Sequence, residues 1–474
     1  MNELTFQLDS KIETPLYEQI YIYIKNEIKE GRLCKNMKLP SARRLSTHLE
    51  VSRSTIDVAY GQLVSEGYVY AVPCKGYFVS DIELLVDMTT NTENISKIKR
   101  TALDTKINKQ IDFNIGGIDL DSFPFSTWRK ITKNVLSADN KELFKIGNSK
   151  GDSDFREVIR KYLYESRGVE ANSSQIIVGA GNDYLIMVLS KLLGDVSIGM
   201  ENPCYIQAYK MFNALEHKLC AIDMDEQGIN VKKLAASNVD ICYVTPSHQF
   251  PTGIVMPIKR RLELLKWAGQ KDNRFIIEDD YDSEFRYVGK PIPSLISIDI
   301  DEKVIYMGTL SRSIAPAIRM SYMVLPKALV EKYNTNMNFF SSTVSRIDQT
   351  IVKEFMEDGY FERHLNKMRS IYKTKHDLLI SEIKKMKTPV YISGQNAGVH
   401  ITLQVDNQME EEKLISSAKE NGIIVYGLSN FTIGDYDNYS NNGLKSNILL
   451  GFAGLTADEI VQGILKLDKA WEGK

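Results

Sequence analysis

The sequence predicts a multidomain α/β protein in which a small N-terminal helix-turn-helix unit with a hairpin wing precedes a larger unit built on a mainly parallel sheet. The length of 474 residues allows about two to four domains. The start of the chain shows helical spacing with capping residues, whereas the later sequence alternates short apolar runs with amphipathic stretches. We expect the parts to comprise residues 1–80, a linker at 81–110, and residues 111–474.

The composition is that of a globular protein with nearly balanced charge. The formal net charge is -2, and no apolar run reaches the ~20 residues that a membrane helix needs. The N-terminus does not resemble a signal peptide, so we expect a cytoplasmic protein. The cysteines are odd in number and lack paired spacing, which favours free thiols over disulfides or a metal site. They are Cys34, Cys74, Cys204, Cys220 and Cys242.

Three helices and a hairpin are predicted in residues 1–80. Thr14 as N-cap and Pro15 at the first helical position predict the start of the first helix, and Gly31 predicts its end. Ser41 and Ser52 cap two further helices, separated by a short turn as in a helix-turn-helix. The apolar positions of the three helices are Leu16, Ile20, Ile24, Ile28, Leu45, Leu49, Ile56, Ala59, Leu63 and Val64. Two short aromatic and β-branched runs, interrupted by Pro73 and Gly76, then predict the wing.

Positive charge is concentrated in the same region. Residues 32–76 contain seven basic and three acidic residues, although the whole chain is nearly neutral. The last predicted helix begins with short polar side chains, which a recognition helix directs at base edges and phosphates. The expected DNA contacts are Arg43, Arg44, Ser52, Arg53, Ser54, Thr55, Lys75 and Gly76. A helical domain whose basic residues only solvate its surface is the alternative.

The polar segment 81–110 predicts a flexible connector, with a short helix at residues 83–88 as an alternative. Beyond it, six short apolar runs predict strands buried on both faces of a mainly parallel sheet. Polar or glycine-rich residues follow most of these runs. Because ligands bind at the carboxyl ends of such strands, we expect a site built from residues 179–182, 202–205, 245–249, 279–281 and 309–312.

Two family resemblances make these expectations specific. The stretch "LPSARRLSTHLEVSRSTIDVAYGQLVSEGYVYAVPCKGYFV" resembles the winged-helix domain of GntR-type transcription regulators. The stretches "ENPCY", "TPSHQFPTG", "IIEDDYDSEF" and "GTLSRSIAPAIRMSYMVLP" resemble the fold-type-I aminotransferases, which use pyridoxal 5'-phosphate (PLP). The whole chain is similar to the MocR/GabR-like subfamily, in which the two are fused and the second ends in a small α+β subdomain. The resemblance implies a homodimer that binds operator DNA and senses a small-molecule amine or PLP.

The resemblance also implies a role for each PLP contact. The phosphate would bind the amides of Ala180, Gly181 and Asn182, the hydroxyls of Thr309 and Ser311, and Arg319. Asp279 would pair with the pyridine nitrogen, with Glu278 and Asp280 as alternatives. Tyr205 would stack on the ring, and Tyr281 would donate to its hydroxyl. Taken singly, each assignment has an alternative. Tyr205 could be an ordinary core aromatic, Arg319 a surface ion-pair partner, and the acidic stretch "EDDYD" a solvated turn or a divalent-metal site.

Arg312 stands where the resemblance implies the lysine that binds PLP as a Schiff base. A guanidinium stays protonated and its lone pairs are delocalised, so it neither attacks an aldehyde nor shuttles a proton. We therefore expect no aminotransferase activity and, at most, noncovalent PLP. Three explanations stay open: a natural protein that binds free PLP or a PLP–amine adduct, a variant made to disable the site, or a pocket that no longer binds PLP.

The expected effector pocket contains Gln207, His248 and Asn430. Some members of the subfamily have arginines at the first and last of these positions, where they clasp an amino-acid carboxylate. Without that clamp, uncharged or weakly acidic amines, or PLP itself, are favoured over an effector such as 4-aminobutyrate. Two other functions remain open at this level: an aminotransferase with an accessory DNA-binding module, and a DNA-binding dimer that senses no ligand.

Overall fold

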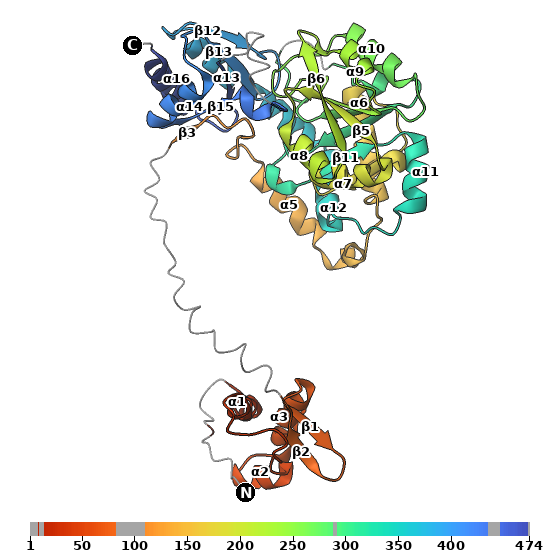
Figure 1. Ribbon diagram of the computed structural model, residues 1–474, viewed down its shortest axis with the longest axis vertical. Helices are drawn as coiled ribbons and strands as arrows, with labels where there is room; N and C mark the ends of the chain where they lie inside the picture. Colours follow the sequence, from red (N-terminus) through yellow and green to blue (C-terminus); the bar gives the residue numbers. More distant parts are fainter. Residues whose placement is uncertain (1–7, 9–13, 82–109, 288–291, 435–445, 473–474) are drawn as a thin grey trace. The chain divides into compact units, whose positions relative to one another are not determined.

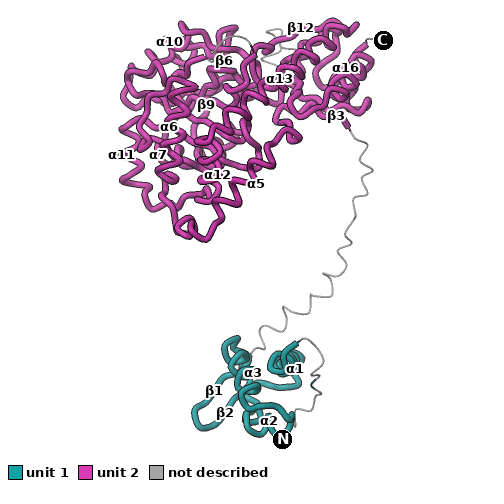
Figure 2. The backbone as a smooth tube through the Cα atoms, turned by 180° about the vertical axis from the view of Figure 1, so that it is seen from behind, with its two compact units in different colours: residues 1–106 teal, residues 107–474 magenta. Residues whose placement is uncertain are grey.

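The computed structural model describes residue 8 and residues 14–81, 110–287, 292–434 and 446–472. The chain divides into two compact units, residues 1–106 (unit 1) and 107–474 (unit 2), which Figure 2 distinguishes by colour. Of the expected linker 81–110, only its two end residues are described, and the alternative helix at 83–88 lies outside the described residues. The linker and the exact domain limits therefore stay predictions.

Unit 1 consists of the predicted helices and wing. They are α1 (Leu16–Lys29), α2 (Ala42–His48), α3 (Arg53–Ser65), β1 (Val69–Val72) and β2 (Gly76–Val79), labelled in Figure 1. Ser41 Oγ accepts from the Arg44 amide at 3.3 Å, and Ser52 Oγ accepts from the Thr55 amide at 3.2 Å. These two predicted N-caps are therefore confirmed. The third prediction, Thr14 as N-cap of α1, was wrong by one residue: Pro15 is the N-cap, and it offers no side-chain hydrogen bond. β1 and β2 pair antiparallel, which confirms the hairpin.

One apolar face of each helix builds the core of unit 1. Its buried residues include Ile20, Ile24, Ile28, Leu45, Ile56, Ala59, Tyr60 and Leu63. Tyr60 also donates a hydrogen bond to the Pro40 carbonyl at 2.9 Å. The prediction for Val64 was wrong, since this side chain is 36% exposed. The buried stripe of α3 follows helical spacing from Ile56 to Leu63, and Val64 lies beyond its edge.

The centre of unit 2 is an eight-stranded sheet with the order β4-β11-β10-β9-β8-β5-β6-β7. The strands are β4 (Ile176–Gly179), β5 (Ser197–Asn202), β6 (Lys218–Asp225), β7 (Gly228–Ile229), β8 (Ile241–Val244), β9 (Phe275–Asp280), β10 (Val304–Thr309) and β11 (Ser321–Val324). β11 and β7 run antiparallel to their neighbours, and the other pairs are parallel. All six predicted strands are present, and the mainly parallel fold is confirmed.

Helices cover both faces of this sheet (Figure 1). They are α5 (Phe125–Val135), α6 (Ser153–Arg167), α7 (Asn182–Leu193), α8 (Ile206–Ala214), α9 (Val231–Ala236), α10 (Ile258–Ala268), α11 (Lys327–Asn336) and α12 (Arg346–Glu357), with short 3-10 turns η2 (Ala138–Phe144), η3 (Ser173–Gln175), η4 (Ile296–Ile298) and η5 (Pro316–Ile318). Alternate residues of one strand enter different cores: Val178 packs with the α6 and α12 side, and Ile177 with the α7 and α8 side. The continuous apolar runs of the sequence follow from burial on both faces.

The C-terminal part of unit 2 is a small α+β subdomain, as predicted. Its antiparallel sheet has the order β12-β13-β16-β15. The elements are β12 (Val390–Ser393), β13 (His400–Val405), β15 (Tyr426–Gly427), β16 (Asn447–Gly451), η6 (Leu428–Phe431), α13 (Tyr360–Ile383), α14 (Glu411–Glu420) and α16 (Ala457–Trp471). β3 (Ile111–Asp112) pairs in parallel with β14 (Ile423–Ile424). The first described residues of unit 2 are therefore fastened to this subdomain.

The cysteines and the helices agree with the free thiols and the lack of a membrane helix that the sequence predicts, as far as the described residues show. All five cysteines are free thiols. Among the described residues, no helix combines the length and apolarity needed to cross a membrane. The same residues contain no group of three or more histidine, cysteine, aspartate or glutamate side chains arranged to hold a metal ion.

Candidate functional site

A hollow at the carboxyl ends of the central strands gathers most of the predicted ligand contacts. It is lined by nine of the ten predicted residues: Gly181, Asn182, Tyr205, Asp279, Tyr281, Thr309, Ser311, Arg312 and Arg319. Asp183, Phe250 and Ser321 line it too and were not predicted. Ser321 was missed because it begins the antiparallel strand β11, whose first residue, not its last, reaches this edge.

The backbone separates the three consecutive carboxylates at the end of β9. Glu278 accepts hydrogen bonds from the Leu295 and Ile296 amides, at 2.7 and 2.9 Å. Asp280 forms a buried ion pair with Arg167 at 2.8 Å. Because side chains alternate along a strand, Asp279 points to the other face. Of the three, Asp279 is the one that lines the hollow.

Asp279 is buried among groups that bond its carboxyl. Tyr243 donates from its hydroxyl to Oδ2, and Asn182 donates from Nδ2 to Oδ1 at 3.4 Å. Burial raises the pKa of Asp279 to about 7, although these two hydrogen bonds act in the opposite direction. The carboxyl therefore exchanges its proton near neutral pH, and a basic nitrogen placed beside it would convert it to the carboxylate.

Tyr281 is held by a buried histidine. His248 Nδ1 lies 3.0 Å from Asp282 Oδ2 and 2.9 Å from the Tyr281 hydroxyl oxygen. An ionised carboxylate only accepts, so Nδ1 carries a hydrogen that points at Asp282 and, in part, at the Tyr281 oxygen. The hydroxyl hydrogen of Tyr281 is then available to a group in the hollow. Beside it, Tyr205 meets the ring of Phe250 edge-on, with centroids 5.6 Å apart.

The opposite wall carries hydroxyls, a guanidinium and a helix start. Thr309 Oγ1 accepts from the Ser311 amide at 3.2 Å and from Ser321 Oγ at 2.9 Å. Gly181 caps α7 with φ 89°, and a Cβ there would lie 2.6 Å from Arg319 Nη2. Arg319 closes over the start of the helix because this residue is glycine. The donor types match an anion such as a phosphate.

Two details of this wall differ from the predicted cradle. Ala180 does not line the hollow, and its amide donates to Thr343 Oγ1 at 3.1 Å. Arg319 donates to Asp183 Oδ2 at 2.7 Å. The hollow holds about 130 Å³, less than the roughly 300–1,000 Å³ of pockets for drug-sized ligands. A bound group must therefore displace side chains of the hollow. The salt bridge between Arg319 and Asp183 is exposed to solvent, so Arg319 is a side chain that can move.

Arg312 extends across the hollow toward the beginning of unit 2. Its Nη1 donates to the Ile115 carbonyl at 2.8 Å. Its guanidinium carbon lies 5.9 Å from the centroid of the Tyr281 ring. The residue at the expected lysine position thus connects the hollow with the segment that follows β3.

The three residues expected in the effector pocket do not line this hollow. Gln207 is exposed in the first turn of α8, and Asn430 is exposed on η6. The Cys204 amide, two residues before α8, donates a hydrogen bond of 2.9 Å to the Phe431 carbonyl of η6. His248 is buried and acts on Tyr281 instead. The effector pocket stays a prediction.

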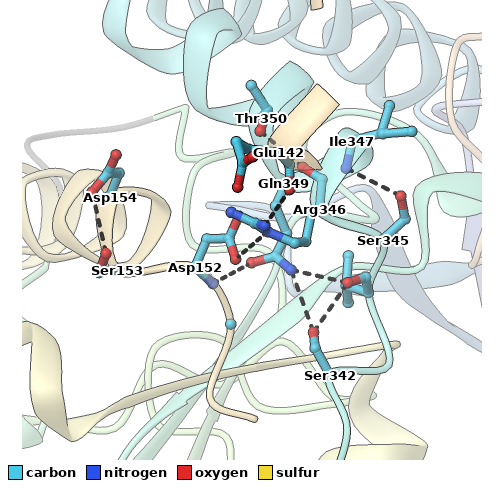
Figure 3. A network of polar contacts seen from close by, with 12 residues as sticks. Glu142, Asp152, Ser153, Asp154, Ser342, Ser345, Arg346, Ile347, Gln349 and Thr350 are labelled. Carbon is cyan, nitrogen blue, oxygen red and sulfur yellow. Dashed lines mark hydrogen bonds and ion pairs between the residues drawn. The ribbon is translucent and has the colours of Figure 1, made fainter. Parts of the chain in front are cut away.

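A network of polar contacts joins residues 142–152 to the start of α12 (Figure 3). Arg346 Nε donates to Asp152 Oδ2 at 3.0 Å. Gln349, fully buried, accepts from the Asp152 amide at 2.8 Å and donates to the Val344 carbonyl at 2.9 Å. Thr343, the residue before Val344, is the one that binds the Ala180 amide. The network therefore supports the loop that begins α7.

In unit 1, most of the expected DNA contacts lie on the surface. Arg43, Arg44, Ser52, Arg53, Ser54 and Lys75 are exposed, and Thr55 and Gly76 are half-buried. They come from α2, the start of α3 and the turn of the wing. Their contact with DNA stays a prediction.

Comparison with known proteins identifies both units. Residues 16–79 match bacterial regulatory proteins of the gntR family, and residues 108–465 match aminotransferase class I and II. An uncharacterized HTH-type transcriptional regulator, YdeL of Bacillus subtilis, is 39% identical, covering 99% of this chain and 100% of that protein. The probable rhizopine catabolism regulatory protein MocR of Rhizobium meliloti is 28% identical, covering 98% and 95%.

Solved structures agree on the fold of unit 2. A Pyrococcus horikoshii kynurenine aminotransferase, in complex with PMP, superposes with a TM-score of 0.66 at 23% identity, covering 77% of this chain and 91% of that chain. The chain therefore belongs to the MocR/GabR-like subfamily of HTH-type transcriptional regulators, in which a gntR-family winged helix is joined to an aminotransferase class I and II domain.

Proposed function

We propose that this regulator binds operator DNA through unit 1 and senses PLP, or a PLP–amine adduct, through unit 2 without a covalent bond and without aminotransferase activity. The observation that carries the proposal is the hollow in which nine expected contact residues meet, with Arg312 among them. A DNA-binding regulator acts where the chromosome lies, which for a bacterial protein is the cytoplasm.

The residues of the hollow fit the chemical groups of PLP. Thr309, Ser311 and the first amides of α7 are suitable donors for its phosphate, and Arg319 joins them once it turns away from Asp183. Tyr205 offers an aromatic face to the ring, and Tyr281 offers its hydroxyl hydrogen to the ring oxygen. When bound, PLP supplies an electron-withdrawing ring and an aldehyde that reacts with free amines.

Asp279 would hold the proton at the pyridine nitrogen. With a pKa of about 7, its carboxyl carries a proton for part of the time at neutral pH. Transfer of this proton to a ring nitrogen leaves a carboxylate beside a cation, and the hydrogen bonds from Tyr243 and Asn182 stabilise that carboxylate. Asp279 therefore selects a ring with a basic nitrogen.

Arg312 would hold a ligand in place without reacting with it. Its guanidinium has no free lone pair for attack on the aldehyde and releases no proton near neutral pH. An amine already joined to PLP would not be exchanged for a side chain of the protein. This chemistry disfavours the aminotransferase interpretation and favours a binding role.

The same residue offers a route from the hollow to the linker. Arg312 donates to Ile115, and Ile115 lies close after β3, the first described strand of unit 2. An anionic or carbonyl group in the hollow competes with the Ile115 carbonyl for this guanidinium. Ligand binding would then favour a different arrangement of residues 111–117. This can change DNA binding only if the ligand binds one arrangement of the protein more tightly than the other.

We also propose that unit 2 forms a homodimer. Phe144, Ile146 and Phe339 are 70%, 90% and 76% exposed, and such large apolar side chains would gain free energy from burial in an interface. The first two belong to the segment 142–152 that Arg346 and Gln349 hold, so these two side chains are kept in a defined position. Ile146→Asp is expected to shift the protein toward monomers in light scattering.

Titration of PLP into the pure protein tests ligand binding. We expect a saturable absorbance change, no mass increase after borohydride treatment, and an operator affinity that changes with PLP. Arg319→Gln should weaken PLP binding at least tenfold, whereas Arg160→Gln, which removes a similar surface ion pair with Glu157, should not. Steady turnover of amino donors by the unmodified protein would contradict the proposal.

One observation favours a second candidate, a DNA-binding dimer that senses no ligand. The hollow is small, and Arg319 is engaged by Asp183. Under this alternative, neither the chain with Arg312 nor Arg312→Lys changes its spectrum with PLP, while operator binding persists.

A further inference from the structure

The exposed face of α3 contains an apolar residue that does not belong to the core formed by the described residues of unit 1. Val58 is 52% exposed, whereas Ile56, Ala59, Tyr60 and Leu63 of the same helix are fully buried. Its neighbours one turn away are Ser54 before it and Gln62 after it, and both are exposed. Val58 is therefore an isolated apolar side chain on a polar helix face.

Gly61 lies on the same face, three residues after Val58. A Cβ built at Gly61 would meet nothing within 4 Å, and its backbone is in the ordinary helical region. Glycine is less favourable than alanine inside a helix. None of the residues that the structure describes in unit 1 requires a glycine here, so the position suits the close approach of another molecule.

The charges around this face define the chemistry of that molecule. Arg43 of α2 and Lys75 of the wing are exposed and form no ion pair with any residue that the structure describes. Arg53 begins α3, with its Nε 3.6 Å from Asp57. A polyanion complements such a surface, and an α-helix fits the major groove of DNA.

We propose that Val58 packs against the 5-methyl group of a thymine in the major groove, and that Gly61 allows α3 to approach the DNA closely enough for this contact. The thymine methyl is the apolar group that a base pair presents in this groove. Val58 is thus a specificity-determining residue beyond the polar and basic contacts described above. The inference rests on the proposed operator binding by unit 1.

The test begins with an operator selected from random duplexes by the full-length protein. Each thymine of that operator is then replaced by deoxyuridine, which removes only the methyl group. At one thymine per half-site, we expect the replacement to weaken binding about fourfold, the factor for one buried methyl-sized group. Val58→Ala should weaken binding to the thymine operator by a similar factor and abolish the preference for thymine over uracil.

Val64→Ala is the matched control, because Val64 is a partly exposed valine of the same helix that lies nearer its C-terminal end. It should preserve both the affinity and the thymine preference. Gly61→Ala should slow amide hydrogen exchange in α3, since alanine favours the helix, and yet weaken operator binding at least fivefold. A variant that is more stable and yet binds DNA more weakly has lost a contact, because unfolding would make amide exchange in α3 faster.

The outcomes distinguish this inference from the proposed function. If the protein selects no duplex at all, operator binding itself is wrong. If it selects an operator whose thymines all tolerate deoxyuridine, or if Gly61→Ala binds as tightly as the natural chain, the assignment of Val58 and Gly61 is overturned while operator binding stands. Loss of binding to another protein on Val58→Ala, with DNA binding intact, would also overturn it.

Discussion

The expected DNA contacts and the expected ligand contacts of this chain are assembled in different ways. The first follow one another along α2, α3 and the wing, and most of them are exposed. The second come from the ends of β4, β5, β9 and β10 and meet in one hollow, where burial changes their chemistry. The chemistry of a surface built from consecutive residues is set by the types of its side chains. The chemistry of the hollow is set also by the surroundings that distant segments supply.

Arg312→Lys is expected to have the largest effect of these changes, because it places an amine at the position where the family resemblance implies the Schiff-base lysine. A lysine whose amine loses its proton in this setting can bind the PLP aldehyde covalently. Borohydride treatment with PLP should raise the mass of most Arg312→Lys chains by one pyridoxyl group and leave the chain with Arg312 unchanged. Arg312→Met, of similar length without an amine, is the control. A covalent product on the natural chain would sink the prediction.

Gln349→Ala tests how much the polar network around Gln349 contributes to the stability of unit 2. The change leaves the Asp152 amide and the Val344 carbonyl without their partner and creates a cavity. We expect a loss of about 3 kcal/mol in the free energy of unfolding. Thr350→Ala, one residue away, should cost about 0.5 kcal/mol or less. Equal effects in denaturant titrations would argue against a special role for the network.

Asp279→Asn tests the effect of burial on a single carboxyl. The folded-state pKa of Asp279 is about 7 and its ordinary value is 3.8, so between these values the folded state keeps a proton that the unfolded state has lost. This contribution to stability is present at low pH and declines as pH rises to about 7. Asparagine removes the titration.

The free energy of unfolding of Asp279→Asn relative to the natural chain should therefore rise by about 2 kcal/mol from pH 5 to pH 7. Paired denaturant titrations at these two pH values measure the difference. An offset that does not vary with pH would show that this carboxyl has an ordinary pKa.

Arg43→Ala is expected to have the smallest effect and probes the exposed region. Arg43 makes no ion pair with the described residues, so its loss should leave stability nearly unchanged. Operator affinity should fall by about 1 kcal/mol, similarly for all sequences, and the slope of affinity against salt should decrease by about one. Lys259→Ala, an exposed lysine of α10 in unit 2, provides the comparison. An unchanged salt slope would exclude a phosphate contact.

The sequence predicted the elements of both regions because their signals are local. Ser41 and Ser52 were identified as caps from residue type and position, and the six strands from apolar runs followed by polar residues. Val64 was assigned wrongly because it lies at the edge of the buried stripe, where periodicity does not discriminate. Ser321 was missed because it begins an antiparallel strand, and Phe250 because it lies one residue beyond the predicted segment 245–249.

By itself, the sequence determined that residue 312 is a guanidinium and not an amine, and that residues 16–79 form capped helices with a wing, since both follow from side-chain chemistry and backbone periodicity. Tertiary structure alone decided which carboxyl of the triplet 278–280 faces the hollow, why its pKa rises, and that Arg312 reaches the carbonyl of Ile115. The reason is physical: desolvation and hydrogen-bond partners come from segments far apart in the chain, and their meeting is a property of the fold.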